Sequence, residues 1–311
     1  MNRRAFLTRS SGLVASLCLP VPLPAFSAGR GKEPFHISLA EWSLHRSLFG
    51  GAIHPLDFPV VARRTYGIDA VEYVNAFFLP SPEFLKELKR RADGEGVRTL
   101  LIMVDEEGRL GDPNASLRKD AVERHRVWVD AAKQLGGHSI RVNARSEGTR
   151  EEQMRLMADG LRQLAEHAAP NGINVLIENH GGLSSDGEWL AGLMKMADHP
   201  RVGTLPDFGN WFQTPWGARS QDGPAAAEYD RYRGVDLMMP FARGVSAKSY
   251  DFDAAGNETS TDFDRMLRVV LKHGFDGHVG IEYEGERLSE HDGILATKRL
   301  LERVRKRLAS E

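Results

Sequence analysis

The sequence predicts an α/β fold in which eight parallel strands close into a (β/α)8 TIM barrel, forming a single domain. From residue 35 onward, short β-rich runs alternate strictly with longer helical patterns, and there are eight of each. The chain has 311 residues, 41% of them hydrophobic and 27% charged; a barrel of this kind typically needs about 250 residues. No Gly-x-Gly-x-x-Gly motif follows an early strand, which disfavours the alternative, an open doubly wound sheet.

Each predicted strand is a short run rich in β-branched and other apolar residues. The strands are expected at His36–Ala40, Ala70–Val74, Thr99–Val104, Ser139–Asn143, Asn174–Glu178, Val202–Pro206, Gly244–Lys248 and His278–Glu282.

Each predicted helix follows a strand and has the apolar spacing or the capping residues of a helix. The helices are expected at Phe58–Tyr66, Pro82–Gly94, Leu117–Leu135, Arg150–Ala169, Gly187–Ala197, Tyr229–Ala242, Asp262–Lys272 and Glu290–Leu308. Thr149 with Glu152, and Ser185 with Glu188, have the capping-box spacing of a helix start.

The N-terminus carries the features of a cleavable export signal. Arg3 and Arg4 precede an apolar stretch that ends in small residues around Ser27. The paired arginines indicate the twin-arginine route, so residues 1–28 are predicted to be the signal and residues 29–311 the barrel. The apolar stretch is too short and too rich in proline to span a membrane, so no stable membrane insertion is expected after cleavage. We therefore expect a periplasmic or secreted protein.

The net charge and one long insertion indicate which partners to expect and what could cover a site. A formal net charge of -2 provides no broad basic face, so no nucleic-acid partner is expected. Homo-oligomerisation remains open. The longest irregular insertion, residues 209–224, is rich in tryptophan and follows the sixth strand, where it is a candidate lid.

Three acidic residues end apolar runs in the second half of the chain, namely Glu178, Asp207 and Glu282. A carboxylate at the end of a buried strand is costly to desolvate unless a cation or a proton is present. Since the carboxyl ends of barrel strands converge on one face, we expect the three to share a site. Their hard oxygens suit Mn²⁺ or Mg²⁺, or Co²⁺ or Zn²⁺ if a nitrogen ligand joins them. His180, two residues after Glu178, is the nearest candidate for that nitrogen, although a histidine there also serves to fix a loop.

Other polar residues at predicted strand ends are candidates for binding a polyhydroxylated ligand. They are His45, Glu106, Asn143, His180, Asn210 and Lys248. Lys248 is predicted either to bind a substrate oxygen or to pair with Asp207 or Glu282. The structural alternative for each acid is a salt bridge at the rim of the barrel.

Four motifs, in the order LIENHGG, LPDFGN, VSAKSYDFD and GIEYEGE, resemble those of the xylose-isomerase-like TIM-barrel family of sugar phosphate isomerases and epimerases. The resemblance covers nearly the whole chain after the predicted signal. It implies that Glu178, Asp207 and Glu282 hold one divalent metal ion, and that the two glutamates also act as acid and base. Two positions depart from the family pattern. Ser246 stands where the family has a metal-binding histidine, and Asn210 stands where it commonly has a substrate-binding histidine.

The resemblance implies chemistry that begins with proton abstraction next to a carbonyl group, through an enediolate that the metal ion stabilises. Return of the proton then produces an epimer or an isomer. Since sugar phosphates are largely cytoplasmic, export favours a non-phosphorylated sugar. We expect a metal-dependent sugar isomerase or epimerase. One alternative is a lyase or hydratase that eliminates the aglycone of a 3-keto-glycoside. A second is a non-catalytic periplasmic carbohydrate-binding barrel, which the two departures would favour.

Overall fold

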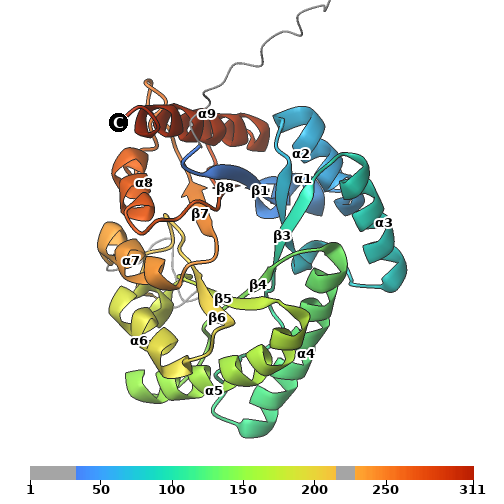
Figure 1. Cartoon of the computed structure of the whole chain (residues 1–311), viewed down its shortest axis with the longest axis vertical. Coiled ribbons are helices and arrows are strands. Elements are labelled where there is room, and N and C mark those ends of the chain that lie inside the picture. The colour runs from blue at the N-terminus through green and yellow to red at the C-terminus, as the bar shows by residue number, and fades with distance from the viewer. Residues whose placement is uncertain (1–32, 215–227) are drawn as a thin grey trace, which may run out of the picture. The chain divides into compact units, whose positions relative to one another are not determined.

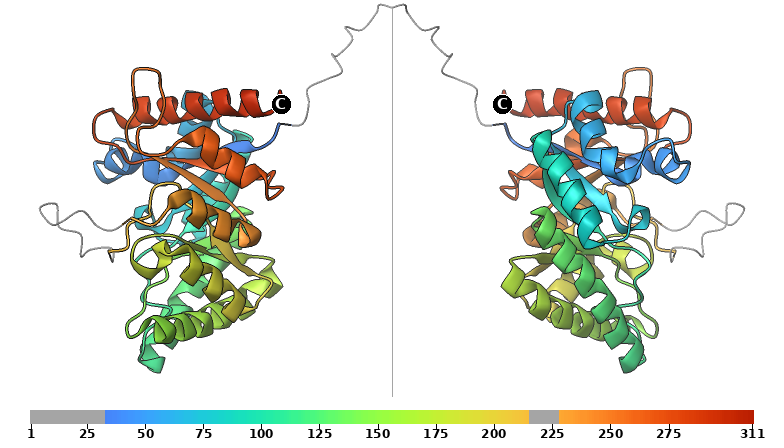
Figure 2. Two further views of the ribbon diagram at one scale, coloured as in Figure 1. Left: turned by 90° about the vertical axis from the view of Figure 1, so that its left-hand side faces the viewer. Right: turned by 90° about the vertical axis from the view of Figure 1, so that its right-hand side faces the viewer.

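The computed structural model describes residues 33–214 and 228–311, and the compact unit begins at Glu33. Its strands form one sheet that curls into a barrel with the helices on the outside (Figures 1 and 2). The predicted export signal lies outside the described residues, as do residues 215–224 of the predicted lid. No helix in the described part of the chain is long and apolar enough to cross a membrane.

All eight predicted strands are confirmed, and no end differs from its prediction by more than one residue. They are β1 His36–Ala40, β2 Ala70–Val74, β3 Arg98–Met103, β4 Ser139–Val142, β5 Asn174–Glu178, β6 Val202–Leu205, β7 Val245–Ser249 and β8 His278–Tyr283. They pair in parallel in the order β6-β5-β4-β3-β2-β1-β8-β7. All strand ends therefore converge on one rim, as a barrel site requires.

The barrel closes between β6 and β7 through single bridges instead of a regular ladder. Thr204 bridges to Ala242, and Asp207 bridges to Ser246. The Phe208 amide donates to the Ser246 carbonyl at 3.0 Å. This closure places the side chains of Asp207 and Ser246 next to each other at the rim.

The helices alternate with the strands as predicted. They are α1 His45–Phe49, α2 Phe58–Tyr66, α3 Pro82–Gly94, α4 Ala115–Leu135, α5 Arg150–Ala168, α6 Gly187–Ala197, α7 Arg231–Met238, α8 Phe263–Leu271 and α9 Glu290–Leu308. The Thr149–Glu152 capping box at the start of α5 is confirmed. Short 3-10 turns lie between several elements.

Two local predictions were wrong, and one helical segment was not predicted. The helix predicted over Tyr229–Ala242 is shorter, because after α7 the chain forms a 3-10 turn that contains Pro240, which has no amide proton to donate. The cap of α6 is Asp186 instead of Ser185, whose hydroxyl donates to the Asn210 carbonyl at 2.6 Å. The segment after β1 is helical over Glu41–Leu44 (3-10) and over α1, which the sequence patterns did not indicate.

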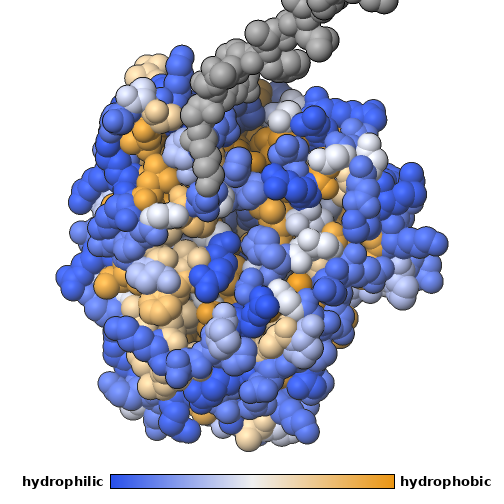
Figure 3. All heavy atoms as spheres, in the orientation of Figure 1, coloured by the Kyte–Doolittle hydropathy of each residue, from blue (hydrophilic) through white to orange (hydrophobic). Residues whose placement is uncertain are grey.

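The core has two parts. A large cluster packs the helices onto the outer face of the sheet, while a smaller apolar cluster is drawn from strands β1, β2, β3, β5 and β6. The smaller cluster consists of Ala40, Val74, Leu101, Met103, Leu176 and Leu205. Figure 3 shows polar residues over most of the outer helices. Gly280 on β8 makes room for a buried acid, since a Cβ there would lie 2.5 Å from Glu72 Oε1.

The first residues of the predicted lid belong to the core. Trp211 and Phe212 are buried, and the Trp211 ring lies against Gly234 of α7, where an added Cβ would be 2.0 Å from Trp211 Cζ3. The first residues of the predicted lid are therefore packed into the barrel wall.

Candidate active site

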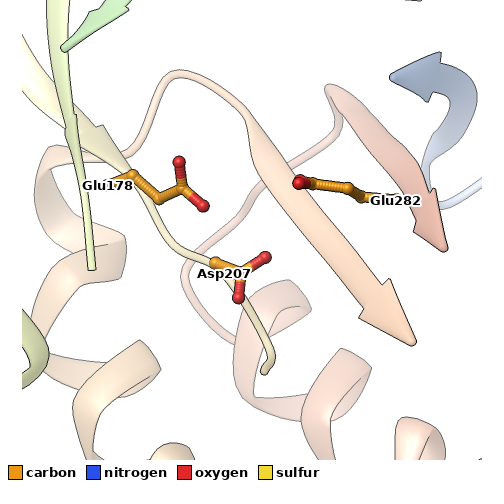
Figure 4. Close-up of side chains that lie close together, drawn as sticks. All are labelled: Glu178, Asp207 and Glu282. Carbon is orange, nitrogen blue, oxygen red and sulfur yellow. The ribbon is translucent and has the colours of Figure 1, made fainter. Parts of the chain in front are cut away.

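The three predicted acids lie together at the carboxyl ends of their strands. Glu178 ends β5, Asp207 follows β6, and Glu282 lies near the end of β8. All three are buried, and each offers a carboxylate oxygen within 4.8 Å of those of the other two. Their carboxyl groups point into a common space (Figure 4).

Asp207 is the most tightly held of the three. Its Oδ1 accepts from the backbone amides of Gly209 and Asn210, both at 2.8 Å, because the chain turns directly after the aspartate. Its Oδ2 accepts from Ser246 Oγ at 2.6 Å. Burial raises the pKa of Asp207 to about 6, although Lys248 and the Ser246 hydrogen bond act against this rise.

Ser246 joins two of the acids. Its Oγ lies 2.6 Å from Asp207 Oδ2 and 2.9 Å from Glu282 Oε2. One hydroxyl carries one proton, so Ser246 donates to one carboxylate at a time. Ser246 therefore adds a hydroxyl oxygen to the carboxylate group.

A fixed cation faces each glutamate. Arg141 Nε lies 2.8 Å from Glu178 Oε2, in an ion pair whose angle departs from that of a hydrogen bond. Lys248 Nζ lies 3.1 Å from Glu282 Oε1 and 3.0 Å from Glu284 Oε2. Burial lowers the pKa of Lys248, but the two glutamates outweigh it, so its pKa lies well above the ordinary value and the amine stays charged. The pairing predicted for Lys248 is thus present with Glu282.

His180 belongs to a separate hydrogen-bond chain. Asp105 Oδ1 accepts from Arg141 Nη1 at 2.7 Å and from Asn143 Nδ2 at 2.5 Å. The Asn143 amide therefore turns its oxygen toward His180 Nδ1, 2.9 Å away, and that nitrogen must be the donor. Burial, together with the charges of Arg141 and Lys248, holds the pKa of His180 well below its ordinary value, so the ring is neutral. The structure does not bring His180 into the carboxylate group as a nitrogen ligand.

A pocket of about 530 Å³ opens beside this chain at the ends of β4 and β5. Asn143 and His180, both predicted to bind substrate, line it together with Arg109, Arg145 and Gln153. A chain of contacts links Asn143 in the pocket lining to Glu178, through Asp105 and Arg141.

Two other predicted substrate-binding residues lie farther out. The His45 ring stacks on Trp42 with a centroid separation of 5.1 Å, and Trp42 Nε1 donates to Glu284. His45 thus borders the site through its contacts with Trp42. Glu106 is exposed and pairs with Arg145 at 2.7 Å. The structure does not bring Glu106 into the carboxylate group.

The sequence analysis missed two aromatic residues at the site. Trp42 follows β1, and Tyr250 follows β7. Tyr250 packs with Lys248 against Gly209, where an added Cβ would lie 2.9 Å from Tyr250 Cε2 and 3.0 Å from Lys248 Cγ. Burial raises the pKa of the Tyr250 phenol, which stays protonated. Both follow a predicted strand directly, so the strand-end rule that found the acids would have found them if aromatic residues had been included.

The donor groups fit a divalent cation. Asn210 Nδ2 donates to Glu178 Oε1 at 3.1 Å, while the buried Asn210 Oδ1 has no hydrogen-bond partner among the described residues. A buried acceptor of this kind is costly to leave unsatisfied. Three convergent carboxylates beside it offer the oxygen donors that hard divalent ions prefer.

Comparisons with known proteins agree with the fold. The chain is 38% identical over 65 residues to the C-glycoside deglycosidase alpha subunit of Arthrobacter globiformis, a match that spans 20% of this chain and only 18% of that protein. The solved structure of 3-keto-D-glucoside 4-epimerase from E. coli superposes with a TM-score of 0.62 at 17% identity, covering 81% of this chain and 94% of that one. The likeness to that structure supports the barrel.

Two further structural neighbours contain metal ions. An IOLI protein with a bound zinc atom superposes with a TM-score of 0.65 at 14% identity, covering 88% of this chain and 99% of that one. A Mycobacterium smegmatis barrel in complex with magnesium has a TM-score of 0.61 at 16% identity, covering 88% of this chain and 97% of that one. The family model described as xylose isomerase-like TIM barrel matches residues 61–306. The chain therefore belongs to the xylose isomerase-like TIM barrel family.

Proposed function

We propose that this protein is a metal-dependent sugar isomerase or epimerase that moves a proton next to a carbonyl group of a non-phosphorylated sugar. The observation that carries the proposal is the pair of buried glutamates, Glu178 and Glu282, which enter one space from β5 and β8 (Figure 4). Proton transfer next to a carbonyl needs one group to remove the proton and another to return it. Sugar binding alone needs no such pair.

Glu178 is the better candidate for the base. Burial raises its pKa well above the ordinary value, although Arg141 opposes this, and a base with a raised pKa removes a carbon-bound proton more readily. Arg141 holds Oε2 and Asn210 holds Oε1. These two contacts orient the carboxylate toward the substrate.

Glu282 is placed to return the proton from the other side. Lys248 pairs with its Oε1, and Ser246 Oγ lies 2.9 Å from its Oε2. The ammonium group of Lys248 has three N–H donors, and its ion pairs with Glu282 and Glu284 use two of them. The third can donate to a substrate oxygen on which negative charge develops.

Glu178, Asp207 and Glu282 would hold the divalent ion. Such an ion, when bound, acts as a Lewis acid that stabilises negative charge on the substrate. Asp207, fixed by two backbone amides and by Ser246, serves as a ligand with little freedom to move.

A second candidate function is elimination from a 3-keto-glycoside, favoured by the likeness to the C-glycoside deglycosidase alpha subunit. The same base would remove the proton from C2. The C–H electrons then form the C1–C2 double bond, the bond from C1 to the aglycone breaks, and the aglycone leaves with that electron pair and takes up a proton. The first half of this reaction is shared with epimerisation, so the same residues serve both.

One experiment separates the candidates. Free ketohexoses and methyl 3-keto-D-glucoside are incubated with the protein and Mn²⁺ in D₂O and followed by NMR. Deuterium next to the carbonyl together with an epimeric or isomeric product supports the proposal. Release of methanol from the keto-glucoside supports elimination, and binding without exchange or release favours a carbohydrate-binding barrel.

Glu178→Gln and Glu282→Gln test the roles of the two glutamates. Each should lower the turnover rate by about a hundredfold or more, since general acid–base groups contribute on this scale. The circular dichroism spectrum should stay unchanged. Glu166→Gln, on the exposed face of α5, is the control and should keep full activity. Full activity in both site variants would rule out the proposed proton transfer.

A further inference from the structure

We propose that Ser246 makes this metal site an all-oxygen site, which shifts its relative affinity from Zn²⁺ and Co²⁺ toward Mn²⁺ and Mg²⁺. The inference rests on the metal-dependent part of the proposed function. It concerns the kind of ion that these side chains select.

Ser246 lies inside the donor group. It is buried on β7, and the bridge between Asp207 and Ser246 that closes the barrel fixes its position. Its Oγ is 2.6 Å from Asp207 Oδ2 and 2.9 Å from Glu282 Oε2. The side chain at position 246 therefore determines which donor atom joins the three carboxylates.

In the described part of the chain, no imidazole nitrogen joins the group. The potential ligand atoms that converge there come from three carboxylates and from no histidine. His180 directs Nδ1 at Asn143. The nitrogens that approach the acids are the cations of Arg141 and Lys248 and the amide donors of Gly209 and Asn210. None of these nitrogens has a lone pair to offer a metal ion.

The chemistry of the donors sets the preference. Carboxylate, hydroxyl and carbonyl oxygens suit Mg²⁺ and Mn²⁺, whereas imidazole favours Zn²⁺ and related ions. Asn210 Oδ1, buried and without a hydrogen-bond partner in the described segments, is a further oxygen beside Glu178. Loss of a nitrogen donor should therefore weaken Zn²⁺ and Co²⁺ binding more than Mn²⁺ and Mg²⁺ binding.

Calorimetric titration of the metal-free protein with each of the four ions tests this preference. Ser246→His should raise the affinity for Zn²⁺ relative to Mn²⁺ on the order of tenfold or more, a scale typical of changes around metal ligands. Ser246→Ala should leave that ratio nearly unchanged. Pulsed EPR of the Mn²⁺-loaded protein should show no directly coordinated ¹⁴N in the wild type and should show it in Ser246→His.

Ser246→Cys is a second test in case the bulkier histidine of Ser246→His prevents folding. Its thiol is nearly isosteric with the serine hydroxyl. Its Co²⁺ complex should show a thiolate-to-cobalt charge-transfer band that the wild type lacks. Two results would overturn this inference while leaving the metal-dependent function intact. One is directly coordinated ¹⁴N in the wild type, and the other is a ratio of Zn²⁺ to Mn²⁺ affinity that no folded variant with histidine or cysteine at position 246 raises. Failure of the wild type to bind any of the four ions would overturn the metal-dependent function as well.

Discussion

Buried acids in this barrel differ in how their charge is compensated. Glu178 and Glu282 at the rim each contact a cation. Glu72, deeper in the barrel, contacts none: its Oε1 accepts from Ser38 Oγ at 2.6 Å, and its Oε2 is buried with no partner among the described residues. Burial raises the pKa of Glu72 to about 7. The two rim glutamates therefore differ from Glu72 in having a cation at contact distance.

Glu72 should make the protein less stable as the pH rises. The ordinary pKa is 4.5 and the folded value is about 7, so between these values the folded state holds more protons than the unfolded state. The free energy of unfolding then falls with increasing pH across this window, by about 3 kcal/mol in total. Urea unfolding from pH 5 to pH 8 measures how the free energy of unfolding changes with pH. Glu72→Gln should remove the part of this change that comes from Glu72, while the exposed Glu166→Gln should keep it. Equal slopes for the wild type and Glu72→Gln would contradict the assignment.

Lys248 should contribute strongly to stability because it is enclosed between two acids. Lys248→Met leaves the buried Glu282 and the half-buried Glu284 without their cation, and breaking a buried ion pair in this way costs about 3–5 kcal/mol. The exposed pair Lys89–Asp93 of α3 offers a matched comparison, where Lys89→Met should cost less than about 1 kcal/mol. Urea unfolding in the presence of EDTA measures both. Similar costs for the two variants would show that burial does not strengthen the Lys248 pair.

At the scale of elements, the seam between β6 and β7 connects the barrel wall to the site. The seam consists of single bridges, one of which joins Asp207 to Ser246. Trp211 supports it from outside: its Nε1 donates to the Asp207 carbonyl at 2.9 Å, and its ring packs on α7 at Gly234. The position of Asp207, a proposed metal ligand, therefore depends on how closely α7 packs against Trp211 in the segment after β6.

Gly234→Ala should destabilise the protein although alanine favours helices. Alanine gains about 1 kcal/mol over glycine in a helix interior, but its Cβ would lie 2.0 Å from Trp211 Cζ3, and overpacking costs about 1–3 kcal/mol or more. Gly94→Ala at the end of α3 is the control, because a Cβ there meets nothing within 4 Å. It should be neutral or stabilising in urea unfolding. A stabilised Gly234→Ala variant would mean that Trp211 moves aside without cost.

At the scale of the whole molecule, closure of the sheet brings eight strand ends to one rim, and the acids, both cations and Trp42 all lie there. The described residues beyond the predicted signal contain no cysteine, which agrees with the proposal that the protein is exported and then works in an oxidising compartment.

Export should depend on the paired arginines. In a bacterium with a twin-arginine pathway, the full chain should appear outside the cytoplasm, with a new N-terminus near Ser27 or Ala28. Replacing both Arg3 and Arg4 by lysine should keep it in the cytoplasm with the signal uncleaved. Cell fractionation and N-terminal sequencing measure this, with a protein exported by the general secretory route as control. Unchanged export of the double variant would rule out the twin-arginine route.

The sequence by itself determined the alternation of strands and helices, since each element depends on the local spacing of apolar residues and on nearby caps. β1, β2, β5, α2, α3, α6 and α9 begin and end where the sequence predicts. It also located Glu178, Asp207 and Glu282, because residues at strand ends share one rim in any closed barrel. Only the tertiary structure decided which side chains meet there. Trp42 reaches Glu284 across 242 positions, and Ser246 reaches Asp207 across 39. Such contacts depend on how the strands pair and where the barrel closes, and no local pattern in the chain records either.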